Sequence, residues 1–370
     1  MFFSRRHFFR VSAAGLLIQK ADLLGAQQAP ASAALEPFHV LPGRSKVALI
    51  QGNNRRQNVH DALVAVDDQI RPKLRQKKYV VIKPNNVTSA NPLAASHVDG
   101  LRGILDYLEP RFKGPVVIAE SAAGDTFENY ENLGYQQLRS EYRSQHVNLV
   151  DLNREAKYET IPLIDFDLHV TPVRLAARLF DPDALVICAA VPKTHNSVVV
   201  TLSIKNMTLG APLHSVRGEA PEWNDKRKYH VGIRQNHYNM FLTARRMQPN
   251  WGVTLIDGFE GMEGNGPTGG TPVPSRIAIA STDFIAADRV ALETMGINPA
   301  WVGYLVYCGQ VGLGNYDLSQ IDVVGASMAA VRKPYRLHAD VERQLQWMGP
   351  MNDLPPKLGY NYDAAAKILA

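Results

Sequence analysis

The chain has 370 residues, with 40 Lys and Arg against 35 Asp and Glu, a formal net charge of +5. That length suffices for one large domain or two modest ones, and two cysteines exclude an iron–sulfur cluster held by four cysteines of this chain. Residues 1–33 contain four of the basic groups and one acid, so 36 basic and 34 acidic groups remain beyond them, a net of +2. The composition therefore gives no support for nucleic-acid binding, and no later apolar run is long enough for a membrane span.

Residues 1–33 have the pattern of an export signal. Paired arginines in "SRRHFFR" precede a moderately apolar stretch and the small-residue segment "APASA", which offers a cleavage site at Ala31–Ala33. The arginine pair followed by x-Phe-Phe resembles the twin-arginine class of signal. We therefore expect a twin-arginine signal peptide, the twin-arginine export machinery as a partner, and a periplasmic or other extracytoplasmic location. A basic disordered N-terminus is the alternative.

From residue 46 onward, apolar β-rich runs alternate with helical patterns. Strands are expected at 46–52, 79–85, 115–121, 147–153, 182–194, 251–258, 275–282 and 321–325, and helices at 59–70, 98–110, 128–145, 284–296 and 299–309. Short, continuously apolar strands that alternate with helices predict an α/β fold. The expected sheet is mainly parallel or mixed, with helices on both faces.

Three segments depart from this alternation. Residues 154–174 predict a small β excursion, and residues 210–238 are long, polar and irregular, which is typical of a functional or disordered loop. Residues 333–370 are expected to form a C-terminal extension that lies on the domain. The expected organisation is a signal peptide at 1–33, a linker at 34–45, an α/β domain at 46–332 and the extension at 333–370.

Polar groups follow four of the predicted strands. Lys83 and Asn85 follow the second strand, and Glu120, Asp257 and the segment "PKTH" at 192–195 follow three others. Ligands of parallel α/β sheets bind beyond the carboxyl ends of the strands, so this coincidence favours a shared site. Each residue alone also has a structural interpretation, as a surface lysine, a helix cap or a buried histidine.

The stretch "TLSIKNMTLG" at 201–210 is expected to begin a helix whose free backbone N–H groups lie beside a lysine. Such a helix start suits a bound phosphate or carboxylate. Three lysines around one cavity imply either lowered pKa values or an anion that compensates their charge. We therefore expect an anionic small molecule held by Lys83, Asn85, Lys193, Lys205 and Asn206, with His195, Glu120 and Asp257 as acid–base groups.

A divalent metal is the alternative to an anion, and the cofactor stays open. Candidate ligands are present, but they show no compact metal-binding spacing, and neither a Walker loop nor a G-x-S-x-G elbow occurs. The candidates are His97, Glu120, His195, His230 and Asp257. Of the two cysteines, Cys188 is expected to be a small buried hydrophobe, and a disulfide with Cys308 is left open.

Six motifs occur in an order that resembles the domain of unknown function family 362. They are "VVIKPNN", "AESAAGD", "LGYQQL", "VPKTHNSVVVTLSIKNMTLG", "LIDGFEGMEGNGPTGG" and "STDFIAADRVALETMG". The resemblance spans about residues 46–325 and implies an α/β fold with a shared pocket, but no substrate. Other members carry an appended ferredoxin-like segment with cysteine clusters, which this chain lacks.

Two functions are consistent with these residues. The first is an exported enzyme that acts on an anionic small molecule by general acid–base or metal-assisted chemistry. The second is a non-catalytic periplasmic protein that binds a ligand or metal, as a carrier or maturation factor.

Overall fold

A computed structural model describes residues 38–216 and 218–349 of the chain. The expected signal peptide at 1–33, part of the expected linker and residues 350–370 of the expected extension lie outside the described residues. Within the described ranges, no helix has the length and apolar character needed to cross a membrane.

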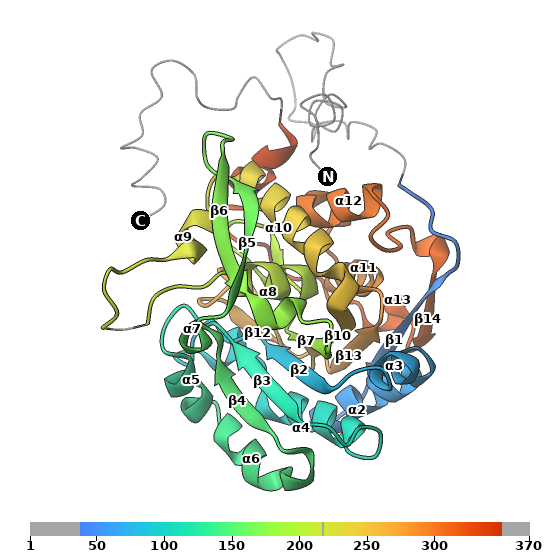
Figure 1. Ribbon diagram of the computed structural model, residues 1–370. Helices are drawn as coiled ribbons and strands as arrows, with labels where there is room; N and C mark the ends of the chain where they lie inside the picture. The colour runs from blue at the N-terminus through green and yellow to red at the C-terminus, as the bar shows by residue number, and fades with distance from the viewer. Residues whose placement is uncertain (1–37, 217, 350–370) are drawn as a thin grey trace.

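The core of the fold is a mixed sheet, which within the described residues has eight strands in the order β14-β1-β13-β10-β7-β2-β3-β4 (Figure 1). Within that sheet β13 runs antiparallel to both neighbours, and the other strands share one direction. The strands are β1 (Ser45–Gln51), β2 (Tyr79–Pro84), β3 (Val116–Glu120), β4 (Asn148–Asp151), β7 (Ala184–Ala190), β10 (Trp251–Gly258), β13 (Ile277–Ser281) and β14 (Ile321–Gly325).

Helices cover both faces of this sheet, and each face has its own hydrophobic core. Along β2, Val80 and Ile82 contribute to one core and Val81 to the other, because successive side chains of a strand point to opposite faces. The first face is covered by α2 (Arg55–Ala65), α3 (Asp67–Leu74), α4 (Val98–Leu108), α5 (Thr126–Asn132) and α6 (Leu138–Glu141). The second is covered chiefly by α8 (Ser203–Gly210), α10 (Ile233–Met247), α11 (Phe284–Met295) and α12 (Gly303–Gln310). The expected α/β fold is therefore confirmed.

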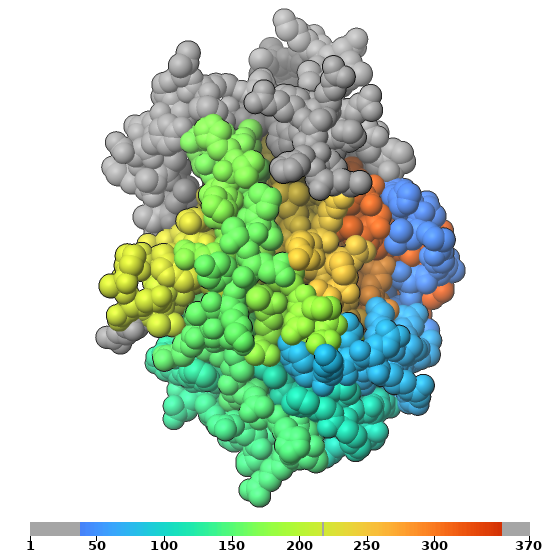
Figure 2. All heavy atoms as spheres, in the orientation of Figure 1, coloured from blue at the N-terminus to red at the C-terminus, as the bar shows by residue number. Residues whose placement is uncertain are grey.

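Two smaller sheets and four short helices complete the described part of the domain. The expected β excursion is the hairpin of β5 (Tyr158–Ile164) and β6 (Val170–Ala176), which adjoins the α9 segment on the face seen in Figure 2. A sheet in the order β12-β11-β8-β9 lies at the carboxyl end of β7. Its strands are β8 (Lys193–Thr194), β9 (Val200–Thr201), β11 (Gly261–Glu263) and β12 (Thr271–Val273), and the short helices are α7 (Leu152–Glu155), α9 (Asp225–Tyr229), α13 (Met328–Val331) and α14 (Val341–Gln344).

The described part of the C-terminal extension packs on the domain. The backbone N–H of Val199 donates a hydrogen bond of 2.6 Å to the side chain of Gln344, and Tyr335 is buried. This contact anchors α14 beside the segment that joins β8 to β9.

The helices differ from the expected ones in three places. Two expected helices are each divided into shorter ones, and one further helix was not expected. The pattern at 59–70 starts earlier, at Arg55, and divides at Val66, whose φ of −116° and ψ of 17° leave the helical region. The pattern at 128–145 divides after α5 because Gly134 adopts a left-handed conformation with φ of 76°, a geometry that ends helices.

Helix α10 was not expected, because its sequence is polar and part of it falls in the segment predicted to be irregular. Its buried face includes amide side chains rather than a continuous apolar stripe. Asn239, for example, bonds both the N–H and the C=O of Ile164 in β5, at 2.9 and 2.8 Å. Hydrogen bonds of this kind allow a polar face to be buried, and a hydrophobic-periodicity argument cannot detect them.

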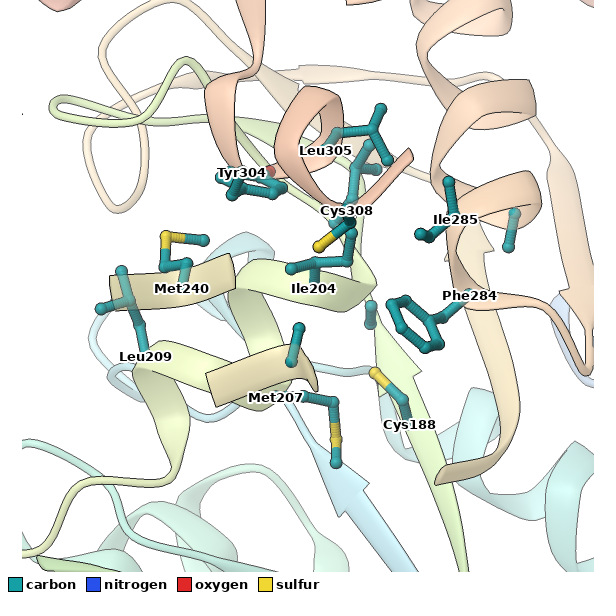
Figure 3. Close-up of a cluster of buried hydrophobic side chains, with 14 of the residues drawn as sticks. Cys188, Ile204, Met207, Leu209, Met240, Phe284, Ile285, Tyr304, Leu305 and Cys308 are labelled. Atoms are coloured by element: carbon teal, nitrogen blue, oxygen red, sulfur yellow. The ribbon is translucent and has the colours of Figure 1, made fainter. Parts of the chain in front are cut away.

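The two cysteines are both free and buried, so the disulfide that the sequence left open does not form. Both thiols lie in the hydrophobic cluster around α8, where Ile204 and Met207 also pack (Figure 3). Burial raises the pKa of Cys188 to about 12 and that of Cys308 well above its ordinary value. Both behave as small apolar side chains.

The amino end of α8 is capped by a residue distant in the sequence. The preceding residue, Leu202, supplies no side-chain cap, and the N–H groups of Ser203 and Ile204 donate to the two carboxylate oxygens of Asp288 at 2.9 and 3.0 Å. The expectation that these N–H groups are free to hold an anion is therefore wrong. Asp288 lies on α11 and is 1% exposed, so it holds α8 from inside the core.

The burial of Asp288 leads to a prediction about how the free energy of unfolding depends on pH. Burial raises its pKa from 3.8 to about 7, so the folded protein binds this proton more tightly than the unfolded chain does. The contribution of Asp288 to the free energy of unfolding is fully present below the ordinary aspartate pKa of 3.8. It is lost as the pH rises through about 7, the pKa of Asp288 in the folded protein. Asp288→Asn keeps an oxygen acceptor for one of the two N–H groups and removes the titration. Between pH 5 and pH 8 we expect the free energy of unfolding of the wild type to fall by about 2 to 3 kcal/mol more than that of this variant.

Urea unfolding of both proteins at each pH measures this difference. Other titrating groups affect both curves equally and cancel in the comparison. Parallel curves for the two proteins would contradict a raised pKa at Asp288.

Candidate functional site

The site lies where β2, β3 and β7, neighbours in the sheet, reach their carboxyl ends. Lys83 stands opposite Cys188 of β7 in the register, and Glu120 is the last residue of β3. Helix α8 crosses above these strand ends and contributes Lys205 and Asn206. Because β2, β3 and β7 are parallel, residues from distant parts of the chain meet at one edge.

A buried ion pair forms the centre of the site. The ammonium group of Lys83 lies 2.8 Å from the Oε2 atom of Glu120, and both side chains are almost fully buried, at 0% and 4% exposure. Lys83 also donates to the Oδ1 atom of Asn206 at 3.2 Å, and Asn85 donates to the same oxygen at 3.0 Å. The backbone N–H of Ser121 donates to the other oxygen of Glu120 at 2.9 Å. Four of the predicted residues are thus joined in one network.

Three further buried lysines surround this pair. Lys193 donates to the carbonyl of Ala94 at 2.6 Å, and Lys226 donates to the hydroxyl of Ser121 at 3.1 Å. Lys205 is 7% exposed and has no hydrogen-bond or ion-pair partner among the described residues. Lys83, Lys193, Lys205 and Lys226 are called the lysine cluster below.

The lysine cluster carries more positive charge than its surroundings compensate. Burial, together with neighbouring ammonium groups, lowers the pKa of Lys205 to about 8 and that of Lys193 well below its ordinary value. Burial lowers the pKa of Lys226 to about 7, although Glu120 partly opposes the shift. Glu120 is the carboxylate that raises the pKa of all three, and it is already paired with Lys83. Near neutral pH Lys205 and Lys226 therefore exist in both protonation states.

His195 faces the same group of charges. Burial lowers its pKa well below the ordinary value, and the charges of Lys205 and His230 add to the effect. The N–H of Ser197 donates to its Nδ1 atom at 3.2 Å, so Nδ1 is unprotonated and the neutral ring carries its proton on Nε2. In this tautomer His195 is a hydrogen-bond donor, and no contact joins it to Glu120 among the described residues.

Asp257 lies outside the lysine cluster. Its Oδ2 atom is 3.4 Å from the Nε atom of Arg55, and its Oδ1 atom accepts from the N–H of Phe259 at 3.1 Å. Burial raises its pKa, and none of the charges that shift it comes from the lysine cluster. The structure thus places the predicted acid–base residues in two locations, with Asp257 beside Arg55.

The candidate metal ligands are dispersed. His97 caps α4 by accepting from the N–H of Asp99 at 3.1 Å, and the Nδ1 atom of His230 contacts the carbonyl of Lys226 at 2.7 Å. Within residues 38–216 and 218–349, no three His, Cys, Asp or Glu side chains are grouped so that they could hold a metal ion.

Lys226 and Ser121 were not among the site residues predicted from the sequence. Lys226 belongs to the polar segment 210–238, where "NDKRKYH" supplies several cations, and only the fold shows which of them turns inward. Asp225 determines this, because it is buried and pairs with Arg174 of β6 at 2.9 Å, fixing α9 against the hairpin. Ser121 directly follows Glu120, and its hydroxyl donates to the carbonyl of Gly210 at 2.5 Å.

Gly210 allows α8 to approach the ion pair. A Cβ atom at this position would overlap the ammonium group of Lys83 and would lie 3.4 Å from Glu120. A larger residue would therefore displace the end of the Lys83 side chain from its position beside Glu120.

The ion pair between Lys83 and Glu120 leads to a second prediction about stability. Glu120→Gln removes the carboxylate that compensates Lys83, and an uncompensated buried charge costs about 3 to 5 kcal/mol of stability. Adding Lys83→Met to that variant removes the uncompensated ammonium, so the double variant should regain most of the loss. Urea unfolding of the wild type, both single variants and the double variant gives the coupling free energy. A double variant no more stable than Glu120→Gln would show that the pair does not carry this energy.

Comparisons with known proteins place the chain in a family. Residues 80–293, more than half of the chain, match the model of the domain of unknown function DUF362. The chain is 24% identical over 240 residues to a thylakoid-associated protein of Synechocystis sp., covering 63% of this chain and 68% of that protein.

A solved structure of a Thermotoga maritima protein is also similar, with a TM-score of 0.36 and 10% identity over 58% of this chain. The match spans 52% of that protein, about half of its length, and no functional inference follows from it. The match to the family model includes Lys83, Glu120 and Lys205 together with Asp288, which caps α8. The chain therefore belongs to the DUF362 family.

Proposed function

We propose that this protein is an enzyme that binds an anionic small molecule at the lysine cluster and acts on it by proton transfer. The observation that carries the proposal is the burial of four lysines near Glu120, which is itself paired with Lys83. Buried charges of one sign are stable only when they lose their protons or meet a compensating charge. An anion supplies that charge.

Within the cluster, Lys205 is the group available to a ligand. Lys83 is paired with Glu120, whereas Lys193 and Lys226 already donate to protein oxygens. Lys205 has no such partner among the residues that the structure describes. Its ammonium form would hold an oxyanion by a charge-assisted hydrogen bond, which is stronger than a neutral one.

The same groups suit proton transfer near neutral pH. A general base works best when its pKa lies close to the working pH, and the pKa of Lys205 is lowered to about 8 and that of Lys226 to about 7. The neutral ring of His195 would donate its Nε2 proton in a hydrogen bond to developing negative charge on the ligand. In this proposal a lysine is the base and His195 stabilises the product of proton removal.

Sulfate tests the binding site, because its charge is constant between pH 6 and pH 9. We expect Lys205→Met to weaken sulfate binding at pH 7 about tenfold or more, since a charged hydrogen bond is lost. Lys113→Met is the matched control, because Lys113 is exposed and lies outside the cluster. Isothermal titration calorimetry on the full chain compares the two variants with the wild type.

The wild-type affinity for sulfate should also fall as the pH rises from 6 to 9. Anion binding favours the protonated lysines, and Lys226 and Lys205 lose their protons over this range. Equal affinities for Lys205→Met and Lys113→Met, or an affinity that rises with pH, would reject the lysine cluster as the anion site.

A non-catalytic carrier is the second candidate function, and the complete burial of two lysines of the cluster favours it. Lys83 and Lys193 are both 0% exposed, and a site so enclosed would retain its ligand. The two functions differ in how they depend on pH. A carrier shows only the pH dependence of affinity, whereas an enzyme shows in addition a turnover that depends on a deprotonated lysine and therefore rises with pH.

We further propose that the chain is exported in its folded state by the twin-arginine route. The support is the sequence of residues 1–33, with Arg5 and Arg6 ahead of an apolar stretch. Replacing both arginines by lysine should leave the uncleaved protein in the cytoplasm of a host with this pathway. Cell fractionation followed by N-terminal sequencing measures the outcome. Export of the variant at the wild-type level would contradict this route.

A further inference from the structure

The orientation of the amide of Asn206 is fixed by its neighbours. Its Oδ1 atom accepts from the ammonium group of Lys83 at 3.2 Å, which only an oxygen can do. Its Nδ2 atom lies 3.4 Å from the carbonyl oxygen of Lys83 and 3.3 Å from the sulfur of Cys188, both acceptors. Rotating this amide by half a turn would set a donor against the ammonium group.

Because Asn206 is fixed, Asn85 is fixed as well. Asn85 contacts the Oδ1 atom of Asn206 at 3.0 Å, and only its Nδ2 atom can donate to that oxygen. Its backbone is also held, since its N–H donates to the hydroxyl of Ser96 at 2.8 Å and that hydroxyl donates to the carbonyl of Ala189. The Oδ1 atom of Asn85 is therefore an acceptor in a determined place beside the lysine cluster.

This acceptor has no partner among the described residues. The Oδ1 atom of Asn85 is buried and accepts no hydrogen bond, and the residue as a whole is 4% exposed. A buried acceptor without a donor costs roughly 1 to 3 kcal/mol, so such groups almost always have a partner. The Oδ1 atom of Asn85 can therefore accept a hydrogen bond from a group that binds beside Lys83, with which it shares the contact to Asn206.

We propose that the ligand of this site is an anion that carries a hydroxyl group beside its charged group, and that Asn85 recognises the hydroxyl. A hydroxy acid or a phosphorylated alcohol has this combination. The inference rests on the proposed anion site and adds a second recognition element to it. The lysines bind the oxyanion, and the Oδ1 atom of Asn85 accepts the hydroxyl proton.

A hydroxyl fits better than an ammonium group, which would also be a donor. The lysine cluster already contains four lysine side chains near Glu120, so a ligand ammonium group would add further positive charge to the site. A hydroxyl donates a hydrogen bond without adding charge. It also discriminates sharply, because a ligand that lacks it leaves the acceptor unpaired.

The test compares pairs of anions of equal charge with and without the hydroxyl. The probes are malate, as each enantiomer, against succinate, and glycerol 3-phosphate against propyl phosphate, measured by calorimetry on the full chain at pH 7. We expect the hydroxylated member of at least one pair to bind about tenfold or more tightly. Asn85→Leu should abolish this ratio, whereas its affinity for the member without the hydroxyl should change little.

Asn236→Leu is the matched control. Asn236 is likewise a buried amide whose Oδ1 atom has no partner, but it lies on α10, and no hydrogen bond joins it to the lysine cluster among the described residues. The ratio should persist in this variant. The wild-type ratio decides the proposal even if Asn85→Leu does not fold.

The outcomes separate the two proposals. Pairs that bind the wild type within twofold of each other overturn hydroxyl recognition and leave the anion site intact. A wild-type ratio that survives Asn85→Leu overturns the assignment of Asn85. If none of the probes binds and sulfate does not bind, the anion site itself is wrong and the hydroxyl proposal falls with it.

Discussion

The buried ion pair between Lys83 and Glu120 is the interaction on which the site depends. Each charge has left water at a cost of several kcal/mol, and the pair is stable only because both partners are also hydrogen-bonded. Asn206 accepts from the lysine, and the backbone of Ser121 donates to the carboxylate. These bonds join the ends of β2 and β3 to α8, so the geometry of the site is inseparable from the register of the sheet.

Helix α8 is held at both ends by constraints that come from other parts of the chain. At its start the carboxylate of Asp288 accepts from two backbone N–H groups, and at its end Gly210 lets the helix approach Lys83. The role that an anion was expected to play at this helix start is thus filled by a side chain, and Lys205 is left for a ligand.

The sequence predicted the fold well because hydrophobic patterns determine it. The continuously apolar runs of β7 and β2 identify strands without any knowledge of their partners. Helix α10 escaped because Asn239 is buried through hydrogen bonds rather than through apolar contact. At the site, Lys83, Glu120, Lys193 and His195 were identifiable from their positions after strands. Lys226 was not, because the pairing of Asp225 with Arg174 that turns it inward joins residues about fifty positions apart.

The same contrast explains why the chemistry could not be inferred from the sequence. A lysine in a sequence is a cation, and only burial converts it into a group with a pKa of about 8 or about 7, as for Lys205 and Lys226. Lys205 and Lys226 are therefore partly uncharged near neutral pH, which reduces the repulsion among the buried lysines near Glu120. In the proposed function, an incoming anion would stabilise the charged form of these lysines, so Lys205 and Lys226 would take up protons as it binds. Under that proposal, proton uptake and anion binding would be one process at this site, because the burial that makes the lysines unstable as cations is also what would make them effective bases.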